Sequence, residues 1–397
     1  MTWSKVDRVS SGLISREAPG GRRPRVGPTG VLSPDQYITL PTLITMYVRP
    51  VEVHDLDDLI GLFGAAGRWL VGMSNLTAAP DVIEERIALS QRSFQSEVAQ
   101  PGEEFYWFVL VEEESGEVVG TSGIAAAVGL RDPFYSYKVG TLVHASPKLD
   151  VYSRHRTLYL TNDYTGLAEL CSLYLSPGFR RHGVGRLLSL HRLLFIAENM
   201  ERFPPRAIAE MRGVIDESGV APFWQGLGAR FFAMSFVEAD RAYGEGNKSF
   251  IAELMPRHPI YVDLLPPAAQ AAIGEVHERT LPALRMLEEE GFSDQGYVDI
   301  FDAGATIEAS LAQVRAVRES AVATAVAVAT ADACDPLLVA NRELGGYRCV
   351  MSDRADLAQL AEGAVIGLPA AVLERLGVQD GGEVRLVKAR QTPPGPE

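Results

Sequence analysis

Cysteine is scarce in this sequence, and so are long apolar runs. Three cysteines in 397 residues, Cys171, Cys334 and Cys349, are too few and too scattered for a disulfide framework or a zinc cluster. The most apolar run, Ser320 to Ala331, has twelve uncharged residues, whereas a membrane-spanning helix needs about 20. We therefore expect no transmembrane segment and no contact with a membrane, and the low cysteine content fits a reducing cytoplasm.

Positive charge is also in short supply. Lys and Arg total 37 against 51 Asp and Glu, which gives a net charge of -14. Such a balance argues against general binding to nucleic acid or to an anionic membrane. An anionic ligand must then be met by a locally positive site.

The remaining composition is that of a globular protein. Hydrophobic residues make up 47% and charged residues 22%, which excludes collagen-like and disordered classes. The length predicts two or three domains, at roughly 100–200 residues each. Residues 1–45 differ, with six Lys and Arg against three Asp and Glu; we expect a disordered or misannotated extension, with Met46 as a candidate start. The beginning lacks the apolar core and cleavage site of a secretory signal.

From Met46 onward, strand and helix patterns alternate. Strands are predicted at 47–50, 105–112 and 117–128, and amphipathic helices at 55–69 and 80–98. A stretch rich in Tyr, His and Asn, 129–165, interrupts this alternation. We interpret it as a polar surface insertion beside the sheet, a common place for substrate contacts.

The strongest signal is a strand, a glycine loop and a helix in succession. The strand is Leu170 to Leu175, the loop contains Arg180-Arg181-His182-Gly183-Val184-Gly185, and the helix runs from about Arg186 to Asn199. Glycines let backbone N–H groups turn toward a pyrophosphate, and the helix N-terminus and nearby arginines supply positive charge. So short a motif fits an ordinary strand-to-helix turn equally well.

This succession resembles the acyl-CoA binding motif of the GCN5-related N-acetyltransferase (GNAT) superfamily. Ala221 to Ala229 resembles a later segment of that superfamily, a small helix followed by Leu-Gly. Longer blocks are similar to the arginine N-succinyltransferase family: Gly140 to Ser146, Leu160 to Asp163, Ala209 to Glu217 and Phe250 to Tyr261. The resemblance extends from Met46 to about Arg318, and more loosely to Lys388.

The resemblance implies transfer of a succinyl group from succinyl-CoA to the alpha-amine of L-arginine, in arginine catabolism. It places the family's succinyl-CoA contact at Leu173, with Arg180, Gly183 and Gly185 in the binding loop, and its proton donor at His277. Glu278 stands where the family has proline after the histidine. No metal or prosthetic cofactor is implied; succinyl-CoA is a co-substrate.

The reaction that the resemblance implies makes four demands on the residues of the site. Attack of an amine on a thioester needs a deprotonated amine, an oriented carbonyl, a donor to the oxyanion and a proton for the thiolate. Any histidine can pass a proton near neutral pH, so His258 is a second candidate beside His277. Glu169 and Glu210 are candidate bases, although each is equally suited to an ion pair. Leu173 fits core packing as well as ligand contact.

Binding groups for the acceptor are left open by the sequence. A guanidinium favours carboxylates, and carboxylates favour Arg, Lys or amide donors. The candidates to bind the guanidinium are Glu210, Asp216 and Glu217. The candidates to bind the carboxylates are Arg212, Asn162 and Lys138. Cys171 permits an acyl-cysteine route, but strand alternation places it on one face with Leu173 and Leu175, as a small buried hydrophobe, and direct transfer is favoured.

The expected fold class is α+β: a GNAT-like mixed sheet with flanking helices and a small C-terminal β-barrel-like module. Leu281 to Phe292 repeats the superfamily's ending of a helix followed by Gly-Phe, which suggests a degenerate second copy. The expected divisions are 46–240 for the acyltransferase domain, 241–307 for a second part carrying His277, 308–390 for the β-rich module, and 391–397 for a loose tail.

Two other functions remain open at this point. One keeps the enzyme class and changes the substrate, with ornithine as acceptor or acetyl-CoA as donor. The other is a non-catalytic CoA-binding sensor. We expect small-molecule substrates and no nucleic acid, and a homodimer or a pairing with a paralogous subunit is compatible with the sequence.

Overall fold

The computed structural model describes residues 46–73, 76–181, 183–244, 254–356 and 363–390. The segments 1–45 and 391–397, expected to be an extension and a loose tail, lie outside the described residues. The chain from Leu43 onward forms one compact unit. In the part of the chain that is described, no helix combines the length and the apolar character needed to cross a membrane.

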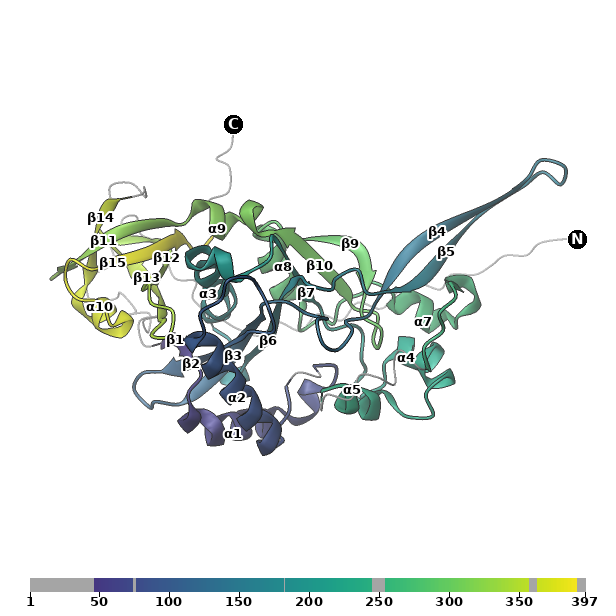
Figure 1. Cartoon of the computed structure of the whole chain (residues 1–397), viewed down its shortest axis with the longest axis horizontal. Coiled ribbons are helices and arrows are strands. Elements are labelled where there is room, and N and C mark those ends of the chain that lie inside the picture. Colours follow the sequence, from purple (N-terminus) through teal and green to yellow (C-terminus); the bar gives the residue numbers. More distant parts are fainter. Residues whose placement is uncertain (1–45, 74–75, 182, 245–253, 357–362, 391–397) are drawn as a thin grey trace, which may run out of the picture. The chain divides into compact units, whose positions relative to one another are not determined.

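A single mixed sheet organises the described residues (Figure 1). Its strand order is β14-β11-β15-β12-β13-β1-β2-β3-β6-β7-β10-β9-β4-β5-β8. Among the described strands, β6 and β7 run parallel, as do β11 and β14, and the other neighbours are antiparallel. The strands are β1 (Met46–Pro50), β2 (Phe105–Glu112), β3 (Val118–Ala125), β4 (Ser136–Ser146), β5 (Val151–Thr161), β6 (Ala168–Leu175), β7 (Arg206–Glu210), β8 (Ile260–Tyr261), β9 (Ser293–Val298), β10 (Ala305–Ser310), β11 (Ala321–Val328), β12 (Ala333–Ala340), β13 (Cys349–Arg354), β14 (Ala364–Pro369) and β15 (Glu383–Lys388).

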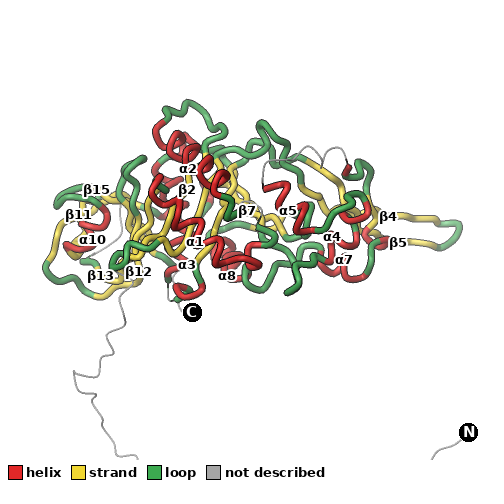
Figure 2. The backbone as a smooth tube through the Cα atoms, turned by 90° about the horizontal axis from the view of Figure 1, so that it is seen from below, coloured by secondary structure: helices red, strands yellow, loops and turns green. Residues whose placement is uncertain are grey.

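Helices cover both faces of the central strands (Figure 2). Strand β2 is buried on both faces because its side chains alternate: Tyr106 and Phe108 pack toward α3, and Trp107 and Val109 toward α1 and α2. The expected α+β class is confirmed by this mixture. The helices are α1 (Leu56–Ala66), α2 (Pro80–Gln95), α3 (Val184–Glu198), α4 (Pro222–Gly226), α5 (Phe236–Gly244), α7 (Pro267–Ala272), α8 (Leu281–Glu289), α9 (Arg315–Glu319) and α10 (Ala370–Leu376).

The stretch 129–165, interpreted from the sequence as a polar surface insertion, contains two long strands that the sequence did not predict. It forms the hairpin of β4 and β5, paired from Ser136↔Thr161 to Ser146↔Val151. Buried Tyr137 and Leu158 anchor its base, whereas most of the outer part is exposed or only half-buried on both faces. An apolar-polar alternation is therefore missing from the sequence, although the backbone ladder is continuous.

Strands β9 and β10 belong to the same sheet as β7, because β10 lies between β7 and β9. Helix α8 is followed by Gly291, with φ of +103°, and by buried Phe292, as the helix and Gly-Phe pattern predicts. The divisions of the chain at 240 and 307 stay predictions, although the strands on both sides of each boundary pair within one sheet.

The C-terminal β-barrel-like module consists of β11 to β15 and α10. Its strands follow the order β14-β11-β15-β12-β13, and a bridge between Asp356 and Gly367 connects the end of β13 back to β14. Helix α10 contributes Val372, Leu373 and Leu376 to the core of this module. Pairing of Val48 with Cys349 joins β13 to β1 and hence to the central sheet.

Candidate active site

The central cavity opens where β6 and β7 separate. These parallel strands pair only at Ala168↔Ala207 and Glu169↔Ile208. Beyond these pairs, residues 170–175 of β6 line a cavity of about 840 Å³, together with residues from the glycine loop, the segment after β7 and α8. No β7 residue is paired with this part of β6, so its backbone groups need other partners. The Cys171 and Leu175 carbonyls accept from Arg192 and Arg180.

A bulge in β6 changes which side chains face the cavity. Ser172 has φ of +52°, and the pairing with β3 shifts between Thr121 and Gly123 at this point. Leu170 and Leu173 therefore pack on the α3 face, whereas Cys171 and Tyr174 pack on the α1 and α2 face. The sequence-based placement of Cys171 and Leu173 on one face is wrong, because the bulge inserts a residue into the alternation.

The Cys171 thiol is buried, as expected from the sequence. Burial, followed by the nearby negative charge of Glu169, raises the pKa of this thiol to about 12. The thiol is therefore protonated at neutral pH, and a protonated thiol is a poor nucleophile. This favours direct transfer over an acyl-cysteine.

The glycine loop brings the expected binding residues to the same cavity, which Leu173, Arg180, Gly183 and Gly185 all line. Gly183 caps α3 with φ of +79°, so the first N–H groups of the helix follow directly from a left-handed turn. The Arg180 side chain is exposed, and its Nε donates to the Leu175 carbonyl at 3.0 Å. These residues surround a helix N-terminus of the kind that binds phosphate.

Replacing Gly183 by alanine is expected to lower the free energy of unfolding by about 1–2 kcal/mol, because a Cβ disfavours a left-handed backbone. The same change is expected to weaken CoA binding, since relaxation of the turn moves the helix N-terminus. Urea unfolding and calorimetric CoA titration measure both effects. Gly178→Ala in the same loop is the control, because the space around a Cβ at that position is open. Equal losses in both variants would contradict the prediction.

His277 lines a second cavity, of about 490 Å³. Arg212 and Arg279 line both cavities. The His277 N–H donates to the Arg212 carbonyl at 2.9 Å, and His277 Nδ1 accepts from the Arg279 N–H at 3.1 Å. Partial burial, and then the charge of Arg212, lower the pKa of His277 below 6.5. The ring is therefore neutral at pH 7, with its proton assigned to Nε2 by the bond at Nδ1.

Two family models match the chain in succession. Residues 46–316 match the model described as "Arginine N-succinyltransferase beta subunit", and residues 318–388 match its C-terminal domain. The chain belongs to the arginine N-succinyltransferase family. A relative named arginine N-succinyltransferase in Enterobacter sp. (strain 638) is 46% identical over 344 residues, covering 86% of this chain and 97% of the relative.

Other members of the family are similar to the same extent. The arginine N-succinyltransferase of Salmonella newport (strain SL254) is 46% identical over 342 residues, covering 86% of this chain and 97% of the relative. A solved structure, the arginine/ornithine succinyltransferase subunit AI from Pseudomonas aeruginosa, has 35% identity and a TM-score of 0.78. That match covers 87% of this chain and 99% of the solved chain.

Several residues that line the central cavity were missed by sequence reasoning. Asp240 comes from α5, Asp299 and Asp302 from the turn between β9 and β10, and Arg279 from the segment before α8. The pattern Asp-x-x-Asp before Gly304 marks a turn in the sequence, but its place beside β6 depends on strand order. Of the acceptor candidates, Glu210 and Arg212 line this cavity, and Asp216 and Glu217 line the second one; Asn162 and Lys138 line neither.

Asp240 is held in an environment that disfavours its charge. Desolvation raises its pKa to about 7, although its Oδ2 accepts from the Gly72 N–H at 2.9 Å. Because the pKa of Asp240 is higher in the folded than in the unfolded state, this residue favours folding at low pH. Its contribution to the free energy of unfolding is lost as pH rises toward 7. Asp240→Asn is therefore expected to stabilise the protein by about 1–3 kcal/mol at pH 8 and by almost nothing at pH 4. Urea unfolding at both pH values measures this difference, and a gain independent of pH would contradict it.

Proposed function

We propose that this chain is an arginine N-succinyltransferase. It transfers succinyl from succinyl-CoA to the alpha-amine of L-arginine, giving N2-succinyl-L-arginine and CoA in arginine catabolism. Membership of the family supports the reaction. In this chain the main support is that β6 separates from β7 beside the N-terminus of α3. The thioester can then bind along β6 while the phosphates of the same molecule bind at the helix N-terminus.

In the proposed reaction the amine nitrogen attacks the thioester carbonyl carbon. A C–N bond forms, the tetrahedral intermediate collapses, and the C–S bond breaks. The amine loses one proton and the departing thiolate gains one. A free backbone N–H on the opened edge of β6 donates to the oxyanion, and Leu173 contacts succinyl-CoA. Arg180, with the N–H groups that follow Gly183 and Gly185, holds its phosphates.

In this proposal His277, which lines the second cavity, exchanges the proton with the adjoining central cavity; Arg212 and Arg279 line both cavities. Because its ring is neutral at pH 7, it takes a proton from the attacking amine before it gives one to the thiolate. Glu169 and Glu210 line the central cavity and are the alternative bases. Succinyl-CoA is the co-substrate, and the site needs no metal or prosthetic group. The cytoplasmic location and a homodimer or paralogous heterodimer stay predictions.

Thiol release by the full chain tests the function. Succinyl-CoA is supplied with L-arginine, with L-ornithine or with no amine, and acetyl-CoA replaces succinyl-CoA in a parallel series. Release that requires both succinyl-CoA and L-arginine is expected. Faster release with ornithine would favour the second candidate, which the description of the Pseudomonas structure as an arginine/ornithine succinyltransferase supports. Binding of CoA without release that depends on an amine would indicate a sensor.

A further inference from the structure

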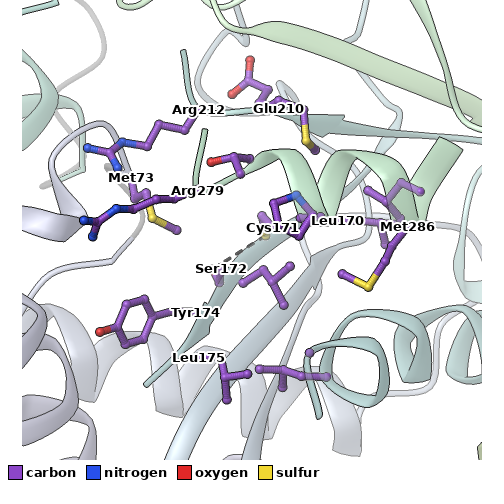
Figure 3. A pocket seen from close by; sticks show the side chains of 18 of the residues that line it. Met73, Leu170, Cys171, Ser172, Tyr174, Leu175, Glu210, Arg212, Arg279 and Met286 are labelled. Carbon is purple, nitrogen blue, oxygen red and sulfur yellow. Dashed lines mark hydrogen bonds between the residues drawn. The ribbon is translucent and has the colours of Figure 1, made fainter. Parts of the chain in front are cut away.

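Two arginines lie side by side on one wall of the central cavity (Figure 3). Arg212 follows β7 and Arg279 precedes α8, so the tertiary fold brings them together across 67 residues of sequence. Burial lowers the pKa of Arg212, Asp302 and Asp240 partly oppose this effect, and the nearby charge of Arg279 lowers the pKa further. Two adjacent guanidinium groups repel each other, and a bound anion removes this repulsion.

Arg212 has hydrogen-bonding capacity that is not used. Its Nε is buried and lacks a hydrogen-bond partner among the described residues. Gly72 packs beside this atom, because a Cβ at that glycine would lie 3.3 Å from it. A buried donor without a partner costs about 1–3 kcal/mol. The Arg212 side chain also lines the open cavity, so a ligand bound there is placed to supply an acceptor to its guanidinium group.

Two of the acidic residues nearby, Asp302 and Asp240, accept hydrogen bonds from backbone N–H groups. Asp302 accepts from the backbone N–H groups of Gly213 and Gly304, at 2.7 and 2.8 Å. Burial and the adjacent Asp299 raise the pKa of Asp302 well above its ordinary value, which disfavours its charged form. Asp240 accepts from Gly72 and has a pKa of about 7. Both environments reduce the negative charge that Asp302 and Asp240 place beside the two arginines.

The position of Arg212 and Arg279 relative to the unpaired part of β6 determines which part of a ligand they can bind. In Figure 3, Ser172 lies between the two arginines and Leu175. The glycine loop belongs to the Leu175 end, where Arg180 bonds the Leu175 carbonyl. A thioester that lies along β6 with its phosphates at the loop therefore directs its acyl group toward Arg212 and Arg279.

We propose that Arg212 and Arg279 form a carboxylate subsite, which binds the free carboxylate of the acyl group on the donor thioester. The pair thereby selects a dicarboxylic acyl group over acetyl. This inference rests on the proposed function, because it takes the thioester to lie along the opened edge of β6. A carboxylate is also present on the amino-acid acceptor, and the test separates these two sources.

The test compares the full chain with Arg279→Gln and Arg212→Gln. Thiol release is measured with succinyl-CoA and acetyl-CoA as donors, and with L-arginine and agmatine, its decarboxylated analogue, as acceptors. Loss of a charged hydrogen-bond donor is expected to lower kcat/KM for succinyl-CoA by about 10- to 100-fold. The rate with acetyl-CoA and the preference for arginine over agmatine are expected to stay unchanged.

Three outcomes would overturn the proposal. A reduced preference for arginine over agmatine, with the donor preference intact, would assign the pair to the acceptor carboxylate. Equal losses with both donors would indicate a structural role, and an unchanged rate would show that the pair does not contribute to the reaction. Arg279→Lys is expected to restore part of the succinyl preference. Arg131→Gln removes an exposed arginine that pairs with Glu103 outside the cavity, and serves as the matched control.

A binding measurement keeps the proposal testable if the chain shows no turnover. Calorimetric titration compares succinyl-CoA, acetyl-CoA and CoA with each variant. The wild-type chain is expected to bind succinyl-CoA more tightly than acetyl-CoA, and this difference is expected to disappear in both glutamine variants while CoA affinity is retained. No preference in the wild-type chain would overturn the subsite. The Arg279 bond to His277 is unaffected, because the backbone N–H makes it.

Discussion

Glu290→Gln is expected to lower the free energy of unfolding by about 3–5 kcal/mol. Glu290 and Arg315 form a fully buried ion pair, with Arg315 Nη2 2.5 Å from Glu290 Oε1. The same carboxylate accepts from the Ala316 N–H, and Arg315 Nη1 donates to the Lys388 carbonyl. Removing the negative charge leaves a buried arginine uncompensated, which costs several kcal/mol. Urea unfolding followed by circular dichroism measures the loss.

The same arginine supplies a matched control. Arg315 Nη1 also lies 3.6 Å from Oε2 of Glu319, whose side chain is 47% exposed. Glu319→Gln is expected to cost less than about 1 kcal/mol, because solvent screens an exposed pair. Replacing both buried partners, with Glu290→Leu and Arg315→Met, is expected to recover much of the lost stability. A cost for Glu290→Gln no larger than that for Glu319→Gln would refute the argument.

His277→Gln is expected to lower kcat by about 10²- to 10⁴-fold, the range for loss of a general acid or base. Binding of succinyl-CoA is expected to persist, since His277 lies in the second cavity. Activity that depends on the neutral ring falls as pH drops through the lowered pKa of His277, so the acid limb of kcat/KM lies below pH 6.5. That limb is expected to disappear in the variant. Initial rates between pH 5 and 8 measure both effects.

His258→Gln is the control for this experiment. His258 is exposed and lines neither cavity, so its replacement is expected to leave the rate and the pH profile unchanged. A comparable loss in both variants would point to a general effect on the fold. Full activity in His277→Gln would transfer the proton-transfer role to Glu169 or Glu210, which line the central cavity.

The glycine loop was predictable because its determinants are local. Gly183 adopts the left-handed conformation that the pattern requires, and the helix begins at Val184, within two residues of the expected start. All apolar residues in the range 187–196 are buried in one core cluster. The polar residues of the same range, Ser189, His191 and Arg192, are buried as well. Such a turn and helix are determined by consecutive residues. Their sequence pattern therefore predicts them without knowledge of the rest of the fold.

The bulge and the hairpin were not predictable in the same way. A positive φ at Ser172 has no marker in the sequence, since serine seldom adopts it, and one extra residue exchanges the faces of the side chains that follow. In β4 and β5, ladder hydrogen bonds persist where few side chains are buried. Apolar periodicity reports burial, and it therefore misses a strand whose two faces are both exposed.

By itself the sequence determined the α+β class, the glycine loop at the N-terminus of α3 and the family, because these depend on local patterns and on long blocks of matching residues. Only the tertiary structure decided that β6 and β7 separate after two residue pairs, that β10 lies beside β7, and that Arg212 meets Arg279. Each of these depends on contacts between segments far apart in the chain. Such contacts arise from strand pairing and packing, which no single stretch of sequence encodes.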